Sequence, residues 1–263
     1  MNKAFAAGVV VALLVSALIA PAWAAQVLKV GANPLPQAPI LEFVKPFLAE
    51  EGIELQIIEF SDYVLPNIAL AEGDIDANLF QHIPYLESFS ADRNLDLTWI
   101  AGVFIAPIGV YSKKIDSLDQ LRNGAEIGIP NDPTNGGRAL LLLESAGLIK
   151  LREGAGLYAT PLDIVQNPKR LRIREIEAPY LPRSLDDLDA AVINTTYSLE
   201  AGFVPVKDAL FIEGAESPYI NVLAVRRADA EREDLQKLAR ALTRPEVRDF
   251  ILEYFEGSLV PAF

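Results

Sequence analysis

Apolar residues recur with strand and helix periods in turn along this chain. Near its beginning, a short apolar run at 27–30 is followed by a Pro-containing loop and by apolar residues at helical spacing between Ile40 and Leu48. Gly52 ends this predicted helix, and residues 53–60 alternate between apolar and polar as a strand does. A strand, a helix and a strand in this order predict a parallel sheet with a right-handed crossover.

The same alternation continues to the end of the chain. It predicts helices at 64–70, 84–89, 139–146, 234–242 and 246–255, strands at 74–80, 97–110 and 220–226, and a short helix leading into a strand within both 117–132 and 185–197. We find no internal repeat and no low-complexity linker. The pattern therefore predicts a doubly wound α/β architecture split into two lobes, in which ligands bind beyond the carboxyl ends of the strands.

The first residues predict a signal peptide. Lys3 precedes an apolar run at 9–20, and Ala22 and Ala24 frame a small-residue cleavage site. The alternatives are a membrane-anchoring helix or a buried helix, but the run is short for a bilayer, which needs roughly 20 apolar residues. We therefore expect residues 1–24 to be removed on export.

Composition narrows the class of protein. The chain has no cysteine, so it can form no disulfide and offers no thiol for a lipid. We therefore expect a protein that is soluble in the periplasm after cleavage, without a lipobox cysteine. A net charge of −13 argues against nucleic acid as a partner, because phosphates would be repelled.

A turn crowded with Asn, Asp, Pro, Thr and Gly stands at 131–137, between a predicted strand at 126–130 and a predicted helix. Asp132 or Thr134 can cap that helix, and the glycines allow positive φ angles and the close approach of a ligand. Free N–H groups at the start of a helix favour an anion.

Arg138 follows this turn directly. Its guanidinium is a planar fork of donors that suits a carboxylate. The turn lacks the Gly-Lys-Ser/Thr ending of a phosphate-binding loop, so an organic carboxylate fits better than a nucleotide. The alternative is that Arg138 forms a surface salt bridge while Gly136 and Gly137 only shape the turn.

Other candidate binding residues also stand near strand ends. Aromatic rings and the single histidine could form an apolar slot with one hydrogen-bonding group, and two amides could meet an amino group and a carboxylate. These candidates are Tyr63, Phe80, His82, Tyr85, Asn194 and Asn221. The alternative for the rings is ordinary core packing, and for the amides it is the satisfaction of local backbone groups.

Catalytic and metal-binding motifs are missing. With one histidine, no cysteine and no Gly-Xaa-Ser-Xaa-Gly, a triad of the serine-hydrolase kind has little support. There is no His-Glu-Xaa-Xaa-His and no cysteine cluster for zinc. We therefore expect no enzyme activity, no metal and no cofactor.

Together these stretches resemble the NlpA/MetQ family, the extracytoplasmic methionine-binding components of ABC importers. The resemblance rests on residues 60–86, 129–151, 191–202, 207–210 and 217–226. It implies the two-lobed type II periplasmic-binding-protein fold, with 25–110 plus 218–263 as lobe 1 and 111–217 as lobe 2.

The resemblance also implies roles for the candidate residues. Arg138 would hold the α-carboxylate of methionine, with Asn194 and Asn221 at its carboxylate and amino ends. Tyr63, Phe80, His82 and Tyr85 would line the pocket for the side chain, where a thioether can lie against aromatic rings. A membrane ABC permease and its ATPase would be the partners of a monomeric binding protein.

The chain also departs from the family's pattern. Gln37 stands where the family usually has histidine, Asn33 where Thr is common, and Thr196 where a second Asn is typical. These departures leave open a different small amino acid or organic anion as ligand. An exported enzyme acting on an amino-acid-like substrate and an interaction protein such as a surface adhesin are the remaining alternatives.

Overall fold

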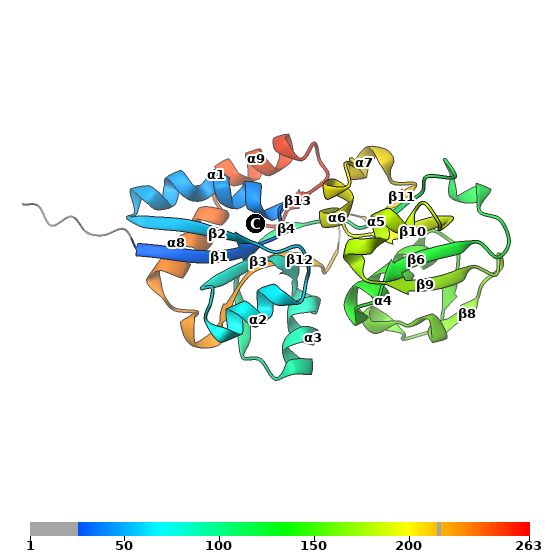
Figure 1. Ribbon diagram of the computed structural model, residues 1–263, viewed down its shortest axis with the longest axis horizontal. Helices are drawn as coiled ribbons and strands as arrows, with labels where there is room; N and C mark the ends of the chain where they lie inside the picture. Colours follow the sequence, from blue (N-terminus) through cyan, green and yellow to red (C-terminus); the bar gives the residue numbers. More distant parts are fainter. Residues whose placement is uncertain (1–25, 215–216) are drawn as a thin grey trace, which may run out of the picture.

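The computed structural model describes residues 26–214 and 217–263, so the expected signal peptide at 1–24 lies outside the described residues. Two sheets, each flanked by helices, stand side by side along the long axis (Figure 1). The strand order is β13-β4-β12-β3-β1-β2 in the six-stranded sheet and β11-β5-β10-β6-β9 in the five-stranded sheet. A short pair, β7 and β8, lies beside the second sheet.

The first sheet is built from both ends of the described chain. Its strands are β1 (Gln26–Ala32), β2 (Ile53–Glu59), β3 (Ala77–His82), β4 (Leu97–Ile105), β12 (Ile220–Arg226) and β13 (Val260–Pro261). β1 pairs in parallel with β2 and β3, as the strand–helix–strand pattern predicts. The late strand β12 then inserts antiparallel between β3 and β4.

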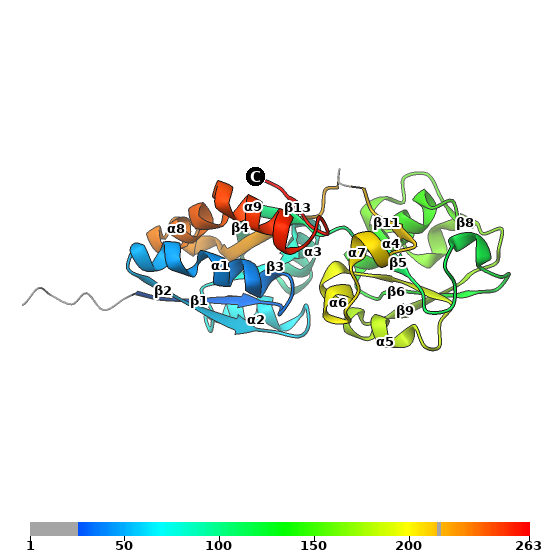
Figure 2. The same cartoon turned by 90° about the horizontal axis from the view of Figure 1, so that it is seen from above.

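Five helices cover the two faces of this sheet (Figure 2). They are α1 (Gln37–Glu50), α2 (Leu65–Glu72), α3 (Ile83–Arg93), α8 (Glu233–Leu242) and α9 (Pro245–Tyr254). Strand β12 is buried on both sides, because Leu223 and Val225 pack in the cluster with α1, α8 and α9 while Val222 and Ala224 pack in the cluster with α2 and α3.

The second sheet is formed by one continuous stretch of chain. Its strands are β5 (Gly109–Tyr111), β6 (Glu126–Pro130), β9 (Arg172–Ile176), β10 (Ala190–Ile193) and β11 (Phe211–Ile212). The helices of this part are α4 (Pro133–Ser145), α5 (Leu181–Ser184), α6 (Thr195–Glu200) and α7 (Pro205–Asp208), and the short pair is β7 (Lys150–Leu151) and β8 (Ile164–Gln166). Leu140 and Leu143 of α4 pack against Ile127 and Ile129 of β6 in its largest core.

The chain passes between the two sheets twice, once after β4 and once between β11 and β12. Strand β5 pairs with β10 and β11, so Gly109 and Val110 belong to the second sheet rather than to lobe 1 as the expected boundary placed them. We therefore move the first proposed crossing to residues 106–108.

The short helix predicted to lead into a strand within 185–197 is not present. α5 ends at Ser184, and the following residues turn towards β10. Asp189 explains the change, because its backbone N–H donates to the carbonyl of Glu126 (3.0 Å) and its carboxylate accepts from the Glu126 N–H (2.8 Å). These two bonds hold Asp189 alongside the start of β6.

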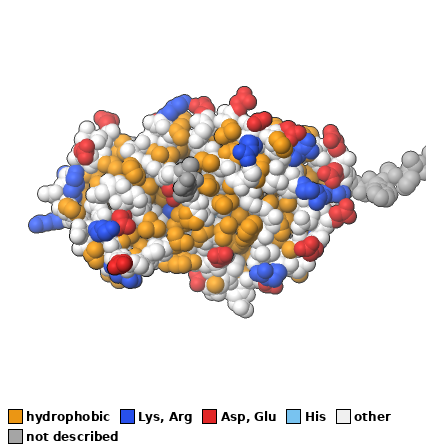
Figure 3. Space-filling model, turned by 180° about the vertical axis from the view of Figure 1, so that it is seen from behind, with side chains coloured by type: hydrophobic (Ala, Val, Ile, Leu, Met, Phe, Trp, Pro, Cys, Tyr) orange, Lys and Arg blue, Asp and Glu red, His pale blue; other side chains and the backbone are white. Residues whose placement is uncertain are grey.

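The face opposite to Figure 1 carries apolar side chains over its middle, with charged side chains mostly around the edges (Figure 3). Within the described ranges, we find no helix with both the length and the apolar character that a membrane span requires.

Candidate functional site

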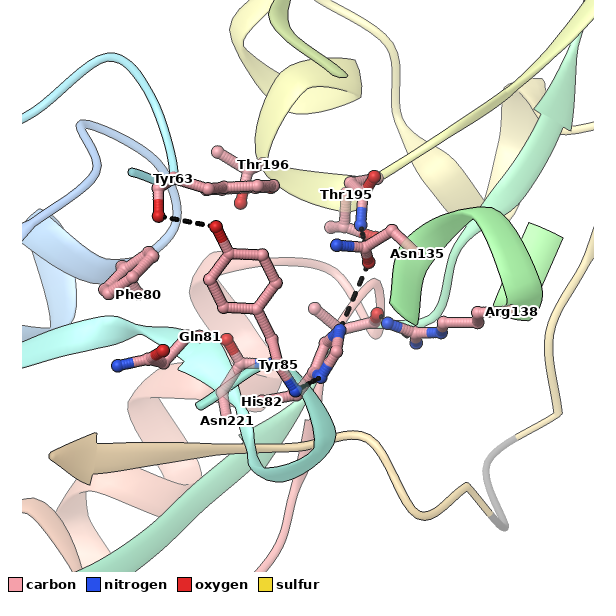
Figure 4. A pocket seen from close by; sticks show the side chains of 12 residues that line it. Tyr63, Phe80, Gln81, His82, Tyr85, Asn135, Arg138, Thr195, Thr196 and Asn221 are labelled. Atoms are coloured by element: carbon pink, nitrogen blue, oxygen red, sulfur yellow. Dashed lines mark hydrogen bonds between the residues drawn. The ribbon is translucent and has the colours of Figure 1, made fainter. Parts of the chain in front are cut away.

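A cavity lies between the two lobes and holds about 350 Å³ of empty space, part of which is open to solvent (Figure 4). All seven candidate residues from the sequence lie on its wall: Tyr63, Phe80, His82, Tyr85, Arg138, Asn194 and Asn221. Five further residues complete the lining, namely Gln81, Ala106, Asn135, Thr195 and Thr196. The fold therefore brings together side chains that are spread over more than half of the sequence.

Three rings form an apolar wall on the side of lobe 1. The ring centroids of Tyr63, Phe80 and Tyr85 lie 6.0–6.1 Å apart. The Tyr85 hydroxyl donates to the Tyr63 carbonyl at 2.7 Å (Figure 4). Burial raises the pKa of both phenols, so they stay protonated and uncharged. This wall suits an apolar side chain.

Strand β3 brings its last residues to this wall through an irregular pairing. Val222 of β12 lies opposite Gln81 and Leu223 lies opposite Leu79, so the ladder skips Phe80. Beyond this bulge, Asn221 lies opposite His82. The irregularity places consecutive residues of one strand on the wall of the cavity.

His82 is neutral and fixed in one tautomer. Its Nδ1 accepts from the backbone N–H of Tyr85 (3.1 Å), which caps α3. Nε2 therefore carries the hydrogen and donates to the Asn135 side-chain oxygen at 3.1 Å. Burial, together with the nearby charge of Arg138, lowers the pKa of His82 to about 3.

Asn135 joins the two lobes, although the sequence alone did not single it out. Its Oδ1 also accepts from Asn194 Nδ2 at 2.7 Å, and its Nδ2 donates to the Asp132 carboxylate at 3.0 and 3.1 Å. His82 comes from lobe 1, whereas Asn194 and Asp132 come from lobe 2. The one signal in the sequence was its place in the Asn-Asp-Pro-Thr-Asn-Gly-Gly turn.

The helix after β6 starts earlier than predicted. α4 begins at Pro133, with Asp132 as its cap, because the Asp132 carboxylate accepts from the Asn135 N–H at 2.9 Å. Arg138 consequently lies inside the helix rather than before it. A protein carboxylate already occupies the helix start, where the sequence suggested that a ligand anion would bind.

The two glycines of this turn serve helix packing rather than ligand approach. Neither adopts a positive φ. A Cβ on Gly137 would lie 2.1 Å from the Leu157 carbonyl oxygen, and one on Gly136 would lie 2.9 Å from the Pro130 carbonyl oxygen. Glycine is required here because neighbouring backbone comes too close for any side chain.

Arg138 is almost fully buried, with 2% of its surface exposed, and its ion pair is not a surface one. Its Nε donates to Glu213 Oε1 at 2.9 Å, and Nη2 donates to Glu213 Oε2 and to the Ala106 carbonyl (3.0 Å). The guanidinium carbon lies 4.1 Å from the centre of the Tyr219 ring. Nη1 has no hydrogen-bond partner among the described residues.

Two amides complete the polar part of the cavity. Asn194 lies at the start of α6, and its buried Oδ1 has no partner within the described part of the chain. Asn221 is 5% exposed and lies between His82 on β3 and Phe104 on β4. Amide oxygens of this kind can accept hydrogen bonds from an ammonium group.

Of the three departures from the family's pattern, Thr196 alone lines the cavity. It belongs to α6 of lobe 2 and lies on the cavity wall together with Tyr63 of lobe 1. Asn33 and Gln37 are buried in lobe 1 behind the wall, bonded to the carbonyls of Phe60 (2.7 Å) and Phe80 (3.5 Å).

The family model described as NlpA lipoprotein matches residues 28–263. The chain belongs to the NlpA lipoprotein family. This membership confirms the resemblance that the sequence motifs suggested.

Relatives within the family match this chain over most of their length. The D-methionine-binding lipoprotein MetQ of Escherichia coli (strain K12) is 50% identical over 211 residues, which cover 80% of this chain and 78% of that protein. A solved structure of a nutrient binding protein from Burkholderia cenocepacia bound to methionine is 48% identical, with a TM-score of 0.87 over 90% of this chain and 100% of that one.

A further structure links the family to transport. It is an ABC transporter, periplasmic substrate-binding protein from Coxiella burnetii, 46% identical with a TM-score of 0.86 over 89% of this chain and 100% of that one. These neighbours confirm the expected two-lobed periplasmic-binding-protein fold.

The expected localisation is corrected by the same comparisons. The family model and the Escherichia coli relative are both described as lipoproteins, a class of proteins that carry a membrane-anchoring lipid. The expectation of a soluble protein without a lipobox cysteine rested on the absence of cysteine from the sequence. Family membership contradicts that expectation.

Proposed function

We propose that this protein is an extracytoplasmic solute-binding protein that captures methionine, or a close analogue, for an ABC importer. The observation that carries the proposal is the cavity between the lobes, which joins an aromatic wall to one buried guanidinium and two amides. The methionine-bound Burkholderia relative and the MetQ relative support methionine as the ligand.

Each part of the cavity suits one part of a methionine molecule. The α-carboxylate would bind at Nη1 of Arg138, and the ammonium would bind at the amide oxygens of Asn194 and Asn221. The thioether would lie against the rings of Tyr63 and Phe80, where sulfur–aromatic contacts are favourable. The neutral ring of His82 adds no charge beside the side chain.

Binding would be coupled to closure of the lobes. Residues of both lobes line the cavity, so a ligand that contacts them stabilises the closed form. Release would follow when the importer favours the open form. In this proposal the protein acts as a monomer, delivers its ligand to a membrane permease with an attached ATPase, and performs no chemistry itself.

Calorimetry with a panel of amino acids tests the ligand. The panel includes both enantiomers of methionine. We expect at least one of them to bind more tightly than leucine, glutamine or serine. If methionine gives no heat of binding while another amino acid or an organic anion binds tightly, a different ligand is favoured. Thr196, which departs from the family's pattern, is the residue on the cavity wall that points to this alternative.

Turnover assays separate binding from catalysis. We expect methionine to be recovered unchanged after prolonged incubation with the protein. Formation of a product that is lost in His82→Ala would contradict the proposal and favour an enzyme.

A further inference from the structure

Glu213 lies where the two chain crossings run side by side. It follows β11 in the second crossing, and its backbone N–H donates to the Ile108 carbonyl of the first crossing at 2.9 Å. Its carboxylate reaches from there to Arg138, which lies 75 residues earlier in the sequence. Nothing in the sequence pattern predicted this pair.

This carboxylate fixes the orientation of the guanidinium. It accepts hydrogen bonds from Nε and from one N–H of Nη2, while the Ala106 carbonyl accepts from the other N–H of Nη2. The Tyr219 ring covers one face of the guanidinium plane. The donors that remain for a ligand are therefore those of Nη1, and their direction is set by Glu213.

The same carboxylate balances the charge of the site. Arg138 is the only one of the twelve lining residues that carries a charge, since His82 is neutral. The Glu213 side chain is 15% exposed and pairs with the guanidinium from outside the lining. A zwitterion entering this site leaves it without net charge, whereas an anion would leave a buried negative charge, which is costly.

We propose that Glu213 is a positioning residue for ligand binding, which orients and neutralises Arg138 so that the cavity selects a zwitterionic amino acid over the corresponding carboxylate anion. This inference rests on the proposed function for its ligand. It assigns the ligand's carboxylate to Nη1 and requires Glu213 to remain in place when the ligand binds.

The test compares methionine with its deaminated analogue, γ-(methylsulfanyl)butyrate, in calorimetry on the purified protein. The selectivity is the Kd for the analogue divided by the Kd for methionine. Both ligands carry the carboxylate, so a general weakening of the site cancels in this ratio. In Glu213→Gln we expect the ratio to fall at least tenfold, because the unbalanced guanidinium favours the anion.

Two variants serve as controls. Glu213→Asp keeps the negative charge and should keep the ratio within about threefold of the original. Glu153→Gln removes an exposed glutamate of the same lobe and should leave it unchanged. A ratio in Glu213→Gln within twofold of the original protein, or an equal fall in Glu213→Asp, overturns the proposal.

A crystal structure of the original protein with methionine tests the inference without any variant. We expect the Glu213 carboxylate to stay within hydrogen-bond distance of Arg138. Displacement of Glu213 by the ligand's carboxylate would show instead that it is an internal stand-in for the ligand. If the protein prefers another amino acid, the proposed function fails, and the same ratio is measured with that amino acid and its deaminated acid.

Discussion

Nε2 of His82 lies 3.1 Å from the side-chain oxygen of Asn135, although one residue ends a strand of lobe 1 and the other lies in the first turn of a lobe 2 helix. This contact is a direct hydrogen bond between the lobes at the cavity wall. Because Asn135 also binds Asn194 and Asp132, its side-chain amide links His82 of lobe 1 to two residues of lobe 2.

Replacement of Asn135 by alanine should weaken methionine binding about tenfold to hundredfold. The change leaves the buried His82 donor, whose bond crosses between the lobes, without an acceptor, which costs about 1–3 kcal/mol. Calorimetry measures the loss, and Asn123→Ala, at an exposed position of the same lobe, is the matched control. Unaltered affinity in Asn135→Ala would mean that this bond does not support closure on the ligand.

Arg138→Ala should reduce methionine affinity more than a hundredfold. Without Arg138 the ligand's buried carboxylate would lack its charged partner, and an unpaired buried charge costs about 3–5 kcal/mol. Arg240→Ala, on the exposed side of α8, should bind methionine normally. If Arg138→Ala binds within about threefold of the original protein, the assignment of the carboxylate is wrong.

The free energy of unfolding should decrease as the pH falls below 6.5, the ordinary value for histidine. The unfolded chain then binds a proton that the buried ring of His82, with its pKa lowered to about 3, does not bind. The slope from this one group is at most about 1.4 kcal/mol per pH unit. His82 is the chain's only histidine, so the interval from 6.5 to about pH 5 isolates it from most carboxylates.

Urea unfolding at several pH values measures this dependence. His82→Gln lacks the titrating ring and should show a flatter curve over the same interval. Equal slopes for the two proteins would contradict the lowered pKa.

Gly137→Ala should destabilise the protein by about 1–3 kcal/mol or more, as overpacking does. The added methyl group would meet the Leu157 carbonyl oxygen at 2.1 Å, so either α4 or the segment around Leu157 must move. Gly214→Ala is the control, since its Cβ would meet no atom of the described residues within 4 Å. Thermal unfolding compares them, and an unshifted midpoint in Gly137→Ala would show that the contact relaxes at little cost.

Most helices and strands could be predicted because the spacing of apolar residues in the sequence reflects which residues are buried in the structure. Strand β12, for example, is apolar at each position from Val222 to Val225 because it is covered on both faces. The start of α4 was harder, since Gly136 and Gly137 resemble a turn until the neighbouring backbone is known. The bounds of the two lobes came from the family resemblance, not from periodicity.

Residues of the candidate site could be predicted from the sequence where the neighbouring residues form a distinctive pattern or the residue type is rare in the chain. Arg138 follows an unusual turn, and His82 is the chain's only histidine. Glu213 and Tyr219 were not recoverable, because their meaning comes from a contact with Arg138 that only the fold creates. Local patterns identify single groups, whereas their partners depend on distant parts of the chain.

The insertion of β12 between β3 and β4 has a consequence for biosynthesis. The stretch from Gly109 to Ile212 holds all the strands of the second sheet and can assemble as soon as it has been made. The first sheet has a gap at its centre until β12 arrives, close to the end of translation. A nascent chain that stops before Ile220 therefore exposes the unpaired edges of β3 and β4, and such edges are sites of aggregation that a chaperone must shield.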